Sequence, residues 1–473
     1  MPIYQISPQD VLFFRDARPM TADAGSGGHG AHWPAPSVFF DAIHAALYRA
    51  FPEIERDTQG QPLWEHEHRF GRSSRRDYQR PPAKRFGSLA TAGPFPRVQT
   101  KDSLTWLFPC PADITTDETG QFPSLAPMKS PSPQTNLPEP WLHPLGSLVA
   151  PSKSEPKPWW SKKAIEAYLR NQPPLPAGLC ASAELFASEW TTGIAIDPAT
   201  QTTGQGEAQG KIYAAEYLRL NPGVSLGAVA TLPLKNGGNA EGLPRLFDGD
   251  GHVLVFGGQQ RACHVTCETN QTTLADRLPV SPAIQGNRVK WVLLSPAAFP
   301  AIASGEVNGK KISAHPGGWL PNWICPDTGQ VLLKKGNTAR QAGESREDWR
   351  KRINDPARHQ PFDASLVAAR IPKQIVLSGW SDYLHLDDAD ESKRGQGAKP
   401  TLLAVPAGAA YYFEGKDAAL LADALSWHGS EQENPRRAKV VNRRSTLLGE
   451  KGYGLGVCGT WDFYENAANP RNP

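Results

Sequence analysis

The hydrophobic positions of this chain follow two patterns, one typical of strands and one of helices. Short apolar runs predict strands over residues 3–14, 193–197, 211–220, 253–256, 289–294, 373–380 and 456–463, with two more within 401–413. Apolar residues three and four positions apart predict helices over 161–170 and 418–427, and a first helix that Ser37 caps and that runs to Ala50. A charged helix is expected within 344–358. Because strands and helices occur in both halves without regular alternation, the pattern predicts an α+β fold.

The chain length predicts more than one domain, and the glycine and proline content predicts long loops. The chain has 473 residues, and single hydrophobic cores stop growing at about 250 to 300 residues. We therefore expect two domains, residues 1–280 and 281–473. The 43 glycines and 45 prolines predict long loops. Prolines are densest over residues 108–160, which we interpret as an extended insertion in the first domain, and glycines are dense at 25–30 and 452–459.

The formal net charge is only +3, but the positive charge is local. Between residues 69 and 86, seven basic residues accompany one acid, and Phe70, Tyr78 and Phe86 lie among them. Guanidinium groups pair with phosphates, and aromatic rings stack on unpaired bases, so this composition favours single-stranded RNA. A solvated loop or a protein-binding arm is the alternative. The candidate RNA contacts of this window are Arg69, Arg72, Arg75 and Arg76.

A second basic window spans residues 436–451 and leads directly into glycines. It holds six basic residues and one acid. Glycines let a backbone approach a polyanion, whose phosphates the N–H groups can then bind together with the basic side chains. The candidates here are Lys439, Arg443, Arg444, Lys451, Gly452, Tyr453 and Gly454. Residues 454–459 also spell G-x-G-x-x-G, but only 14 residues follow, too few for a dinucleotide-binding fold.

Catalytic and metal-binding signatures are sparse. The sequence has no Walker A string, no G-x-S-x-G elbow and no H-E-x-x-H pair. Cys263 and Cys267, with His252 and His264 nearby, lack the usual zinc spacing, so no metal and no cofactor are expected. The acidic cluster at 387–391 is interpreted as a solvated loop rather than a magnesium site, and adjacent residues at 65–68 cannot converge on one point. His29 and His32, in or beside the first glycine loop, could act as a general acid or base in RNA cleavage.

The cellular compartment of the protein is predicted from its cysteines and from the lack of long apolar segments in the sequence. The six cysteines are far apart, which fits reduced thiols in the cytoplasm. Neither a signal peptide nor an apolar stretch of membrane-spanning length is recognisable in the sequence. We therefore expect a cytoplasmic protein without a membrane partner.

The string Asp10-Val-Leu-Phe-Phe-Arg-Asp-Ala-Arg-Pro19 resembles the opening motif of the third-subunit family of the Cmr, or type III-B, CRISPR effector complexes, within the RAMP superfamily. Further matches extend nearly from end to end. They comprise 34–37, 193–197 with 211–213, 257–258 with Arg261, 378–380, 404–408 and 452–454.

The resemblance implies two ferredoxin-like, RRM-related (RAMP) domains with loop-rich insertions. It implies a non-catalytic subunit of antiviral defence that grips the repeat-derived 5′ tag of the crRNA, near the target RNA. Its expected protein partners are the large polymerase-like subunit and a backbone subunit. The candidate RNA contacts are completed by Arg15 and Arg18 of the opening motif, His29 and Arg261.

Two other functions remain open from the sequence. One is a RAMP-type endoribonuclease that processes CRISPR repeat RNA through His29 or His32. The other is a pure protein-interaction scaffold, in which the basic windows meet acidic partner surfaces.

Overall fold

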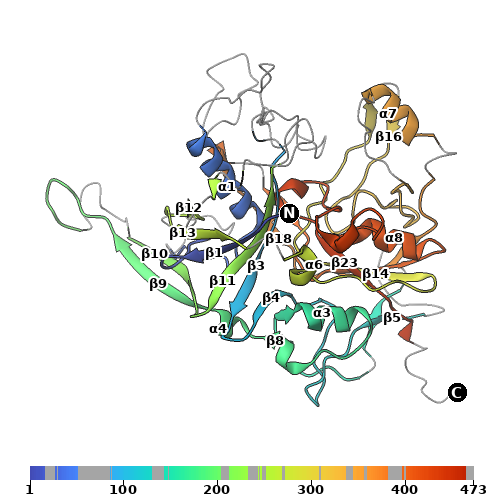
Figure 1. Cartoon of the computed structure of the whole chain (residues 1–473), viewed down its shortest axis with the longest axis horizontal. Coiled ribbons are helices and arrows are strands. Elements are labelled where there is room, and N and C mark those ends of the chain that lie inside the picture. Colours follow the sequence, from blue (N-terminus) through green and yellow to red (C-terminus); the bar gives the residue numbers. More distant parts are fainter. Residues whose placement is uncertain are drawn as a thin grey trace.

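The fold is described from a computed structural model. It describes residues 1–15, 27–28, 30–51, 86, 88–129, 143–147, 149–203, 212–232, 243, 246–247, 252–268, 272–307, 310–336, 345–355, 360–381, 397–398 and 401–464. Figure 1 shows helices and strands mixed throughout, with a long hairpin projecting from one side. The structure is thus a mixed fold of helices and antiparallel sheets, as the sequence pattern predicts.

An eight-stranded sheet forms the body of the N-terminal half. Its order is β12-β13-β1-β11-β3-β4-β7-β8, and neighbouring strands pair antiparallel. The bounds are β12 (His252–Val255), β13 (Ala262–Cys267), β1 (Ile3–Pro8), β11 (Val224–Thr231), β3 (Ala90–Gln99), β4 (Leu104–Pro109), β7 (Trp159–Ser161) and β8 (Leu179–Cys180).

Helix α1 (Pro36–Ala50) packs on this sheet through Phe39, Ile43 and Leu47, all fully buried. The predicted cap is wrong, because the helix begins at Pro36 with Ala35 at the N-cap position. Proline suits the first helical position, where its missing N–H has no partner to lose. The Ser37 hydroxyl bonds instead to the hydroxyl of Tyr453 at 3.2 Å.

A four-stranded antiparallel sheet forms the body of the C-terminal half, in the order β17-β22-β14-β23. The strands are β17 (Ser365–Arg370), β22 (Ala410–Glu414), β14 (Arg288–Leu293) and β23 (Gly456–Gly459), and α8 (Ala418–Leu425) packs on them through Leu421 and Leu425. Residues 456–459 form a strand, not the start of a helix, which agrees with the rejection of a dinucleotide motif.

The projecting hairpin consists of β9 (Phe186–Ile194) and β10 (Ile212–Leu220), and β2 (Gly27–Gly28) pairs with β10. Smaller elements complete the described chain. They are β5 (Ala126–Pro127), β6 (Leu145–Gly146), α3 (Lys162–Leu169), η1 (Pro176–Gly178), α4 (Ser182–Leu185), α6 (Leu274–Arg277), β15 (Gly305–Val307), β16 (Lys310–Ile312), α7 (Arg346–Ile353), β18 (Ile375–Leu377), β19 (Trp380–Ser381), β20 (Gly397–Ala398), β21 (Leu402–Ala404), η4 (Pro435–Arg437) and η5 (Gly449–Lys451).

The strands of the large sheet lie within residues 1–280 and those of the four-stranded sheet within 281–473. One hydrophobic cluster nevertheless spans both halves, with Ile3 and Val229 from the first and Val292 and Leu455 from the second. The halves therefore share a core, and the division into two domains stays a prediction.

The described parts of the proline-rich insertion connect these halves. Asp113 is fully buried and accepts hydrogen bonds of 2.7 Å from the hydroxyls of Tyr168 and Tyr412, while Lys290 lies 3.9 Å away. The Lys290 ammonium also sits 3.7 Å from the centroid of the Tyr168 ring. Burial lowers the pKa of Lys290, and Asp113 opposes that shift. An insertion without an assigned role thus supplies a buried carboxylate that joins α3, β14 and β22.

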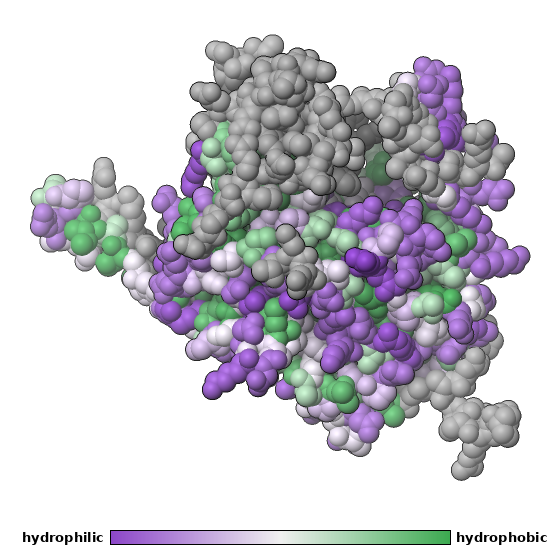
Figure 2. All heavy atoms as spheres, viewed as in Figure 1, coloured by the Kyte–Doolittle hydropathy of each residue, from purple (hydrophilic) through white to green (hydrophobic). Residues whose placement is uncertain are grey.

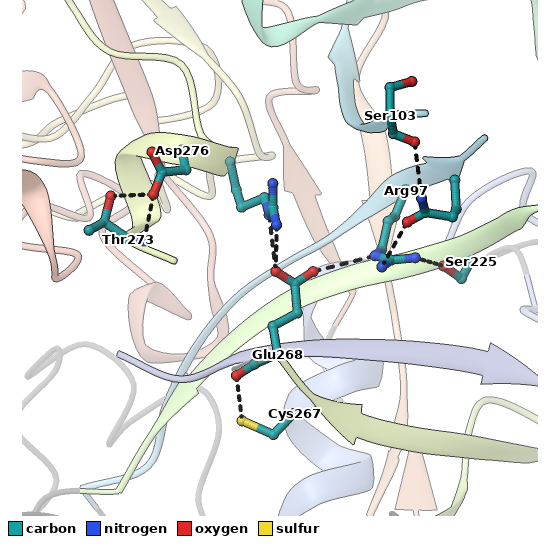
Figure 3. A network of polar contacts seen from close by, with 9 residues as sticks. Arg97, Ser103, Ser225, Cys267, Glu268, Thr273 and Asp276 are labelled. Atoms are coloured by element: carbon teal, nitrogen blue, oxygen red, sulfur yellow. Dashed lines mark hydrogen bonds and ion pairs between the residues drawn. The ribbon is translucent and has the colours of Figure 1, made fainter. Parts of the chain in front are cut away.

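A second polar network joins β3, β11 and α6 of the N-terminal half through Glu268, which directly follows β13, as Figure 3 shows. The Glu268 carboxylate accepts from Arg97 of β3 at 3.4 Å and from Arg277 of α6 at 2.9 Å. Arg97 also donates to Ser225 of β11 at 3.4 Å. Because buried charges are stable only when paired, this network fixes α6 against the sheet.

Candidate functional site

The opening motif lies between two other parts of the chain. On one side, Gln9 N donates to Ala262 O at 3.0 Å and Gly258 N to Phe13 O at 2.8 Å. On the other side, Leu12 exchanges two hydrogen bonds of 2.8 Å with Leu218 of the hairpin. Ala31 N, after the first glycine loop, donates to Phe14 O at 2.6 Å. The described backbone of the motif, residues 10–15, is thereby held between the β12–β13 turn, β10 and Ala31.

The β12–β13 turn reaches the motif through backbone that few residues adopt. Gly257, Gln259 and Gln260 have φ values of +81°, +54° and +53°. A Cβ at Gly257 would lie 2.7 Å from Phe13 O, so the close approach requires glycine. The side chain of Gln259 accepts a hydrogen bond from the Tyr217 hydroxyl. This geometry places the next side chain, Arg261, over the hairpin.

Arg261 stacks on Tyr217, with its guanidinium carbon 4.6 Å from the ring centroid. Its Nη1 lies 3.9 Å from Oδ2 of Asp10, whose other carboxylate oxygen, Oδ1, lies 3.0 Å from Nη1 of Arg219. Arg15 is exposed and pairs in a β-bridge with Gly30. The structure thus brings Arg15 and Arg261, which are 246 positions apart in sequence, to the same motif. We call the surface formed by Asp10–Arg15, Gly257–Arg261 and the base of the hairpin the motif surface.

The hairpin extends one apolar face beyond the motif surface. Ile194 lies opposite Ile212, and Trp190 lies opposite Glu216, on the same face of the ribbon. The side chains of Trp190, Ile194 and Ile212 are 50%, 53% and 50% exposed. Nearer the body, Phe186 and Leu218 of this face are buried. In Figure 2 hydrophobic atoms are visible on the projecting arm. Exposed apolar side chains of this kind mark interaction sites.

A small crevice separates the base of the hairpin from the glycine loop. Gly30, His32, Ser188 and Glu216 are among the residues that line it. Gly30 N donates to the Glu216 carboxylate at 3.2 Å. The exposed ring of His32 meets Phe186 edge-on, with centroids 6.1 Å apart. The crevice therefore brings an imidazole and a carboxylate to one place beside the motif surface.

The second basic window separates into an exposed part and a half-buried part. Arg436 and Lys439 are exposed on a turn that the buried Asn434 holds through both its amide atoms. Arg443 instead donates to Thr91 O at 3.2 Å, and Arg444 donates to Ala424 O at 2.6 Å. Burial lowers the pKa of each of these arginines to about 10. Both guanidinium groups thus make intramolecular hydrogen bonds, although Nε of Arg443 has no hydrogen-bond partner.

The glycine loop that follows is internal as well. Gly452 N donates to Gly449 O at 3.0 Å, Tyr453 N to Leu448 O at 3.4 Å and Gly454 N to Pro296 O at 2.7 Å. Each of these N–H groups therefore has a backbone acceptor in this structure, and RNA binding by residues 452–454 stays a prediction. Tyr453 is fully buried, and burial raises its pKa to about 12.

This loop joins the two halves. A Cβ at Gly452, whose φ is +95°, would lie 3.1 Å from Thr91 O of β3. Lys451 pairs with Asp41 of α1 at 2.7 Å and lies over the Phe40 ring, 4.9 Å from its centroid. We call residues 443–454 the C-terminal clasp, because their side chains reach β3 and α1 of the N-terminal half.

Several predicted positions lie outside the described residues. They are Arg18, His29, Arg69, Arg72, Arg75 and Arg76, together with the acidic cluster 387–391 and the segment 65–68. Within the described part of the chain, no group of three histidine, cysteine or acidic side chains is arranged to hold a metal ion. Among the described helices, none combines the length and apolar character needed to cross a membrane.

Sequence reasoning missed Tyr217, Gln259 and the exposed face of the hairpin. The strand over 211–220 was recognised, but which side of it faces solvent depends on tertiary packing. One signal was available in the sequence. The two strands carry the large apolar residues Trp190, Ile194 and Ile212 close to the turn that joins them, at the end of the hairpin farthest from the core.

A family model described as "CRISPR-associated protein (Cas_Cmr3)" matches residues 4–461. The chain belongs to this family. Membership in Cas_Cmr3 confirms the resemblance drawn from the opening motif and its companion motifs. A search of curated proteins gives no match.

Three solved structures similar to this Cas_Cmr3 chain come from CRISPR complexes. The first, "Cryo-EM structure of the Type III-B Cmr-beta bound to cognate target RNA and AMPPnP, state 1", has a TM-score of 0.38 and 11% identity over 87% of this chain and 86% of that chain. A Type III-B Cmr-beta structure bound to cognate target RNA has a TM-score of 0.35 and 13% identity over 87% and 86%. A Csm3-Csm4 subcomplex of the type III-A interference complex has a TM-score of 0.34 and 10% identity over 88% and 95%.

Proposed function

We propose that this chain is a non-catalytic, cytoplasmic RNA-binding subunit of a type III-B CRISPR effector complex. In this role it grips the 5′ tag of the crRNA near the target RNA and bridges the large polymerase-like subunit to a backbone subunit. It is built from two ferredoxin-like domains, divided near residue 280, and family membership supports the assignment to the complex. The observation that carries RNA binding is Arg261, stacked on Tyr217 at the base of a projecting hairpin.

The chemistry of the motif surface fits RNA. Arginine presents a rigid fork of donors that matches phosphate oxygens, and the Tyr217 ring holds the Arg261 fork in one orientation. Exposed Trp190, Ile194 and Ile212 offer faces on which unpaired bases can pack. Asp10 and Glu189 neutralise part of the local charge, since both pair with Arg219. Arg15 and Arg261 are therefore the principal phosphate contacts of the surface.

A filter-binding titration tests this function. The complex reconstituted with its genomic neighbours should bind RNA carrying the repeat-derived 5′ tag more tightly than RNA of equal length with a scrambled tag. The double variant Arg15→Ala/Arg261→Ala should lose about 100-fold in affinity, and its salt slope should fall by about 0.7 for each phosphate that the variant no longer binds. Lys351→Ala on α7 is a matched control, because this lysine is exposed and pairs only locally with Glu347. Unchanged affinity in the double variant would remove the motif surface from the proposal.

A metal-independent endoribonuclease is the second candidate function, because His32 and Glu216 line one crevice beside the glycine loop. The purified protein, incubated with repeat RNA in EDTA, distinguishes the two. Cleavage that disappears in His32→Ala or His29→Ala would establish the enzyme and exclude a purely binding role. A protein that assembles with its partners yet ignores RNA would instead be a scaffold.

A further inference from the structure

A groove on the N-terminal half lies away from the motif surface. It is bordered by α1 and by β12, the terminal strand of the eight-stranded sheet, which lie side by side in Figure 1. Its volume is about 380 Å³, within the range of ligand-binding clefts. The walls are the alanines of the last two turns of α1 and the side chains of β12, namely Ala42, Ala45, Ala46, Ala50, Val253, Leu254 and Val255, together with Arg49 and His252.

The strand that borders the groove is unprotected in the described structure. Among the described strands, β12 pairs only with β13, so its other edge has no partner there. Natural sheets blunt such edges with charges, prolines, bulges or very short strands. Two other terminal strands follow this rule: β8 has two residues, and β17 has a bulge between Leu366 and Ala368. Strand β12 is also short, with four residues, but its sequence His-Val-Leu-Val contains no proline, lysine or acid and its pairing has no bulge. It exposes 50% of Val253 and 37% of Val255.

The charge of the groove selects its occupant. Arg49 and His252 are the two titratable residues among those that line it, and no lining residue is acidic. Arg49 lies in the last turn of α1 and is exposed. A segment of alternating apolar residues with a carboxylate near the end of α1 would fill the apolar walls and pair with Arg49.

We propose that β12 and α1 form a docking site for an extended, apolar and acidic segment of another protein subunit of the effector complex. The segment adds as a strand to the edge of β12 that has no partner among the described strands, where main-chain hydrogen bonds supply affinity and the groove supplies side-chain specificity. This inference rests on the proposed assignment to a complex, because the occupant is one of its subunits. It is independent of RNA, since neither Arg15 nor Arg261 takes part.

Site-specific photo-cross-linking in the reconstituted complex tests the proposal. Ala45→p-benzoylphenylalanine places the probe on an exposed lining position of α1. Irradiation should join it to another subunit, and mass spectrometry should locate the cross-link in an apolar segment with an acidic residue. Cross-links to RNA, to a second copy of this chain or only within the chain would overturn the proposal.

Two variants and a matched control complete the test. Val253→Lys and Arg49→Glu should each weaken incorporation into the complex at least tenfold, measured by native mass spectrometry at limiting concentration. Val376→Lys changes a valine of β18 that is 42% exposed, and it should incorporate like the unmodified protein. Equal incorporation of all three variants would refute the docking site. Arg49→Glu keeps the test valid if Val253→Lys does not fold, because exposed Arg49 makes no ion pair with another described residue.

RNA titration with the same variants separates this inference from the proposed function. Val253→Lys and Arg49→Glu should bind tagged RNA within about twofold of the unmodified chain. If the unmodified chain does not assemble into the complex, both the proposed function and the docking site are refuted. If the unmodified chain assembles and Val253→Lys and Arg49→Glu assemble equally well, only the docking site is refuted.

Discussion

The motif surface and the C-terminal clasp have similar compositions but make different contacts. Both combine arginines, a tyrosine and at least one glycine with positive φ. At the motif surface Arg261 stays partly exposed over Tyr217, whereas in the clasp Arg443 and Arg444 turn inward and Tyr453 is fully buried. Glycine permits close approach of any backbone, and in the clasp the approaching chain is β3 of the same molecule. A basic, glycine-rich sequence therefore does not by itself show whether the segment binds RNA or contacts another part of the same chain.

The largest effect is expected from breaking the clasp at Arg443. Arg443→Ala removes the donor to Thr91 O and leaves the buried carboxylate of Glu450 without its nearby positive charge. Loss of a charged hydrogen-bond donor that leaves buried polar groups unpaired costs about 3 kcal/mol. Urea unfolding should show this decrease, while the folded variant keeps its affinity for tagged RNA. A variant as stable as the unmodified chain but defective in RNA binding would reverse our assignments of the two regions.

Acid should loosen the region around the clasp through His428. This buried imidazole donates from Nδ1 to Gly429 O at 2.6 Å and accepts from Ser281 N at 3.1 Å, so it is neutral in the fold. Burial lowers its pKa from 6.5 to about 4. Between these values the unfolded chain binds a proton that the native chain does not, so stability is full above pH 6.5 and falls as the pH decreases toward 4.

The loss due to His428 is at most about 3 kcal/mol. Thermal melts from pH 7 to pH 4 measure it, and His428→Gln is the control because it removes the titrating group. If that variant showed the same decline with acid as the unmodified chain, other groups would be responsible.

A smaller effect is expected from Arg261→Ala alone at the motif surface. The change removes one partly exposed guanidinium and should weaken binding of tagged RNA about tenfold, with little change in the free energy of unfolding. Arg261→Lys keeps the charge but loses the planar fork that stacks on Tyr217, so it should recover only part of the affinity. Full recovery by lysine would show that charge alone, without stacking, determines the contact.

The smallest effect is expected at the rim of the clasp. Lys451→Met removes the ion pair with Asp41, whose side chain is 48% exposed, and the contact with the Phe40 ring. Ion pairs of this kind contribute less than about 1 kcal/mol because water and salt screen them. At low salt the free energy of unfolding of Lys451→Met should be slightly below that of the unmodified chain, and at high salt the two free energies should be equal. A loss of stability comparable to that of Arg443→Ala would mean that the Lys451–Asp41 ion pair, rather than Arg443, contributes most to the contact between the two halves.

Much of the local structure was predictable because it depends on near neighbours in the sequence. The helices over 161–170 and 418–427 appear as α3 and α8, and Ser161 caps α3 by accepting from Ala164 N. The strands over 253–256 and 289–294 appear as β12 and β14, within a residue or two. The error at Ser37 arose because a serine can cap a helix or bond elsewhere, and the distant Tyr453 decided between the two.

The sequence alone determined the periodicity of the elements, the family and the local excess of positive charge. Each is a property of residue order, and the opening motif could be recognised without coordinates. Only the tertiary structure decided which charges face solvent. Burial depends on which distant segments pack together, as Arg443 does with Thr91 and Arg261 with Tyr217. The same long-range packing left one edge of β12 without a described partner beside α1, a feature that no stretch of sequence contains.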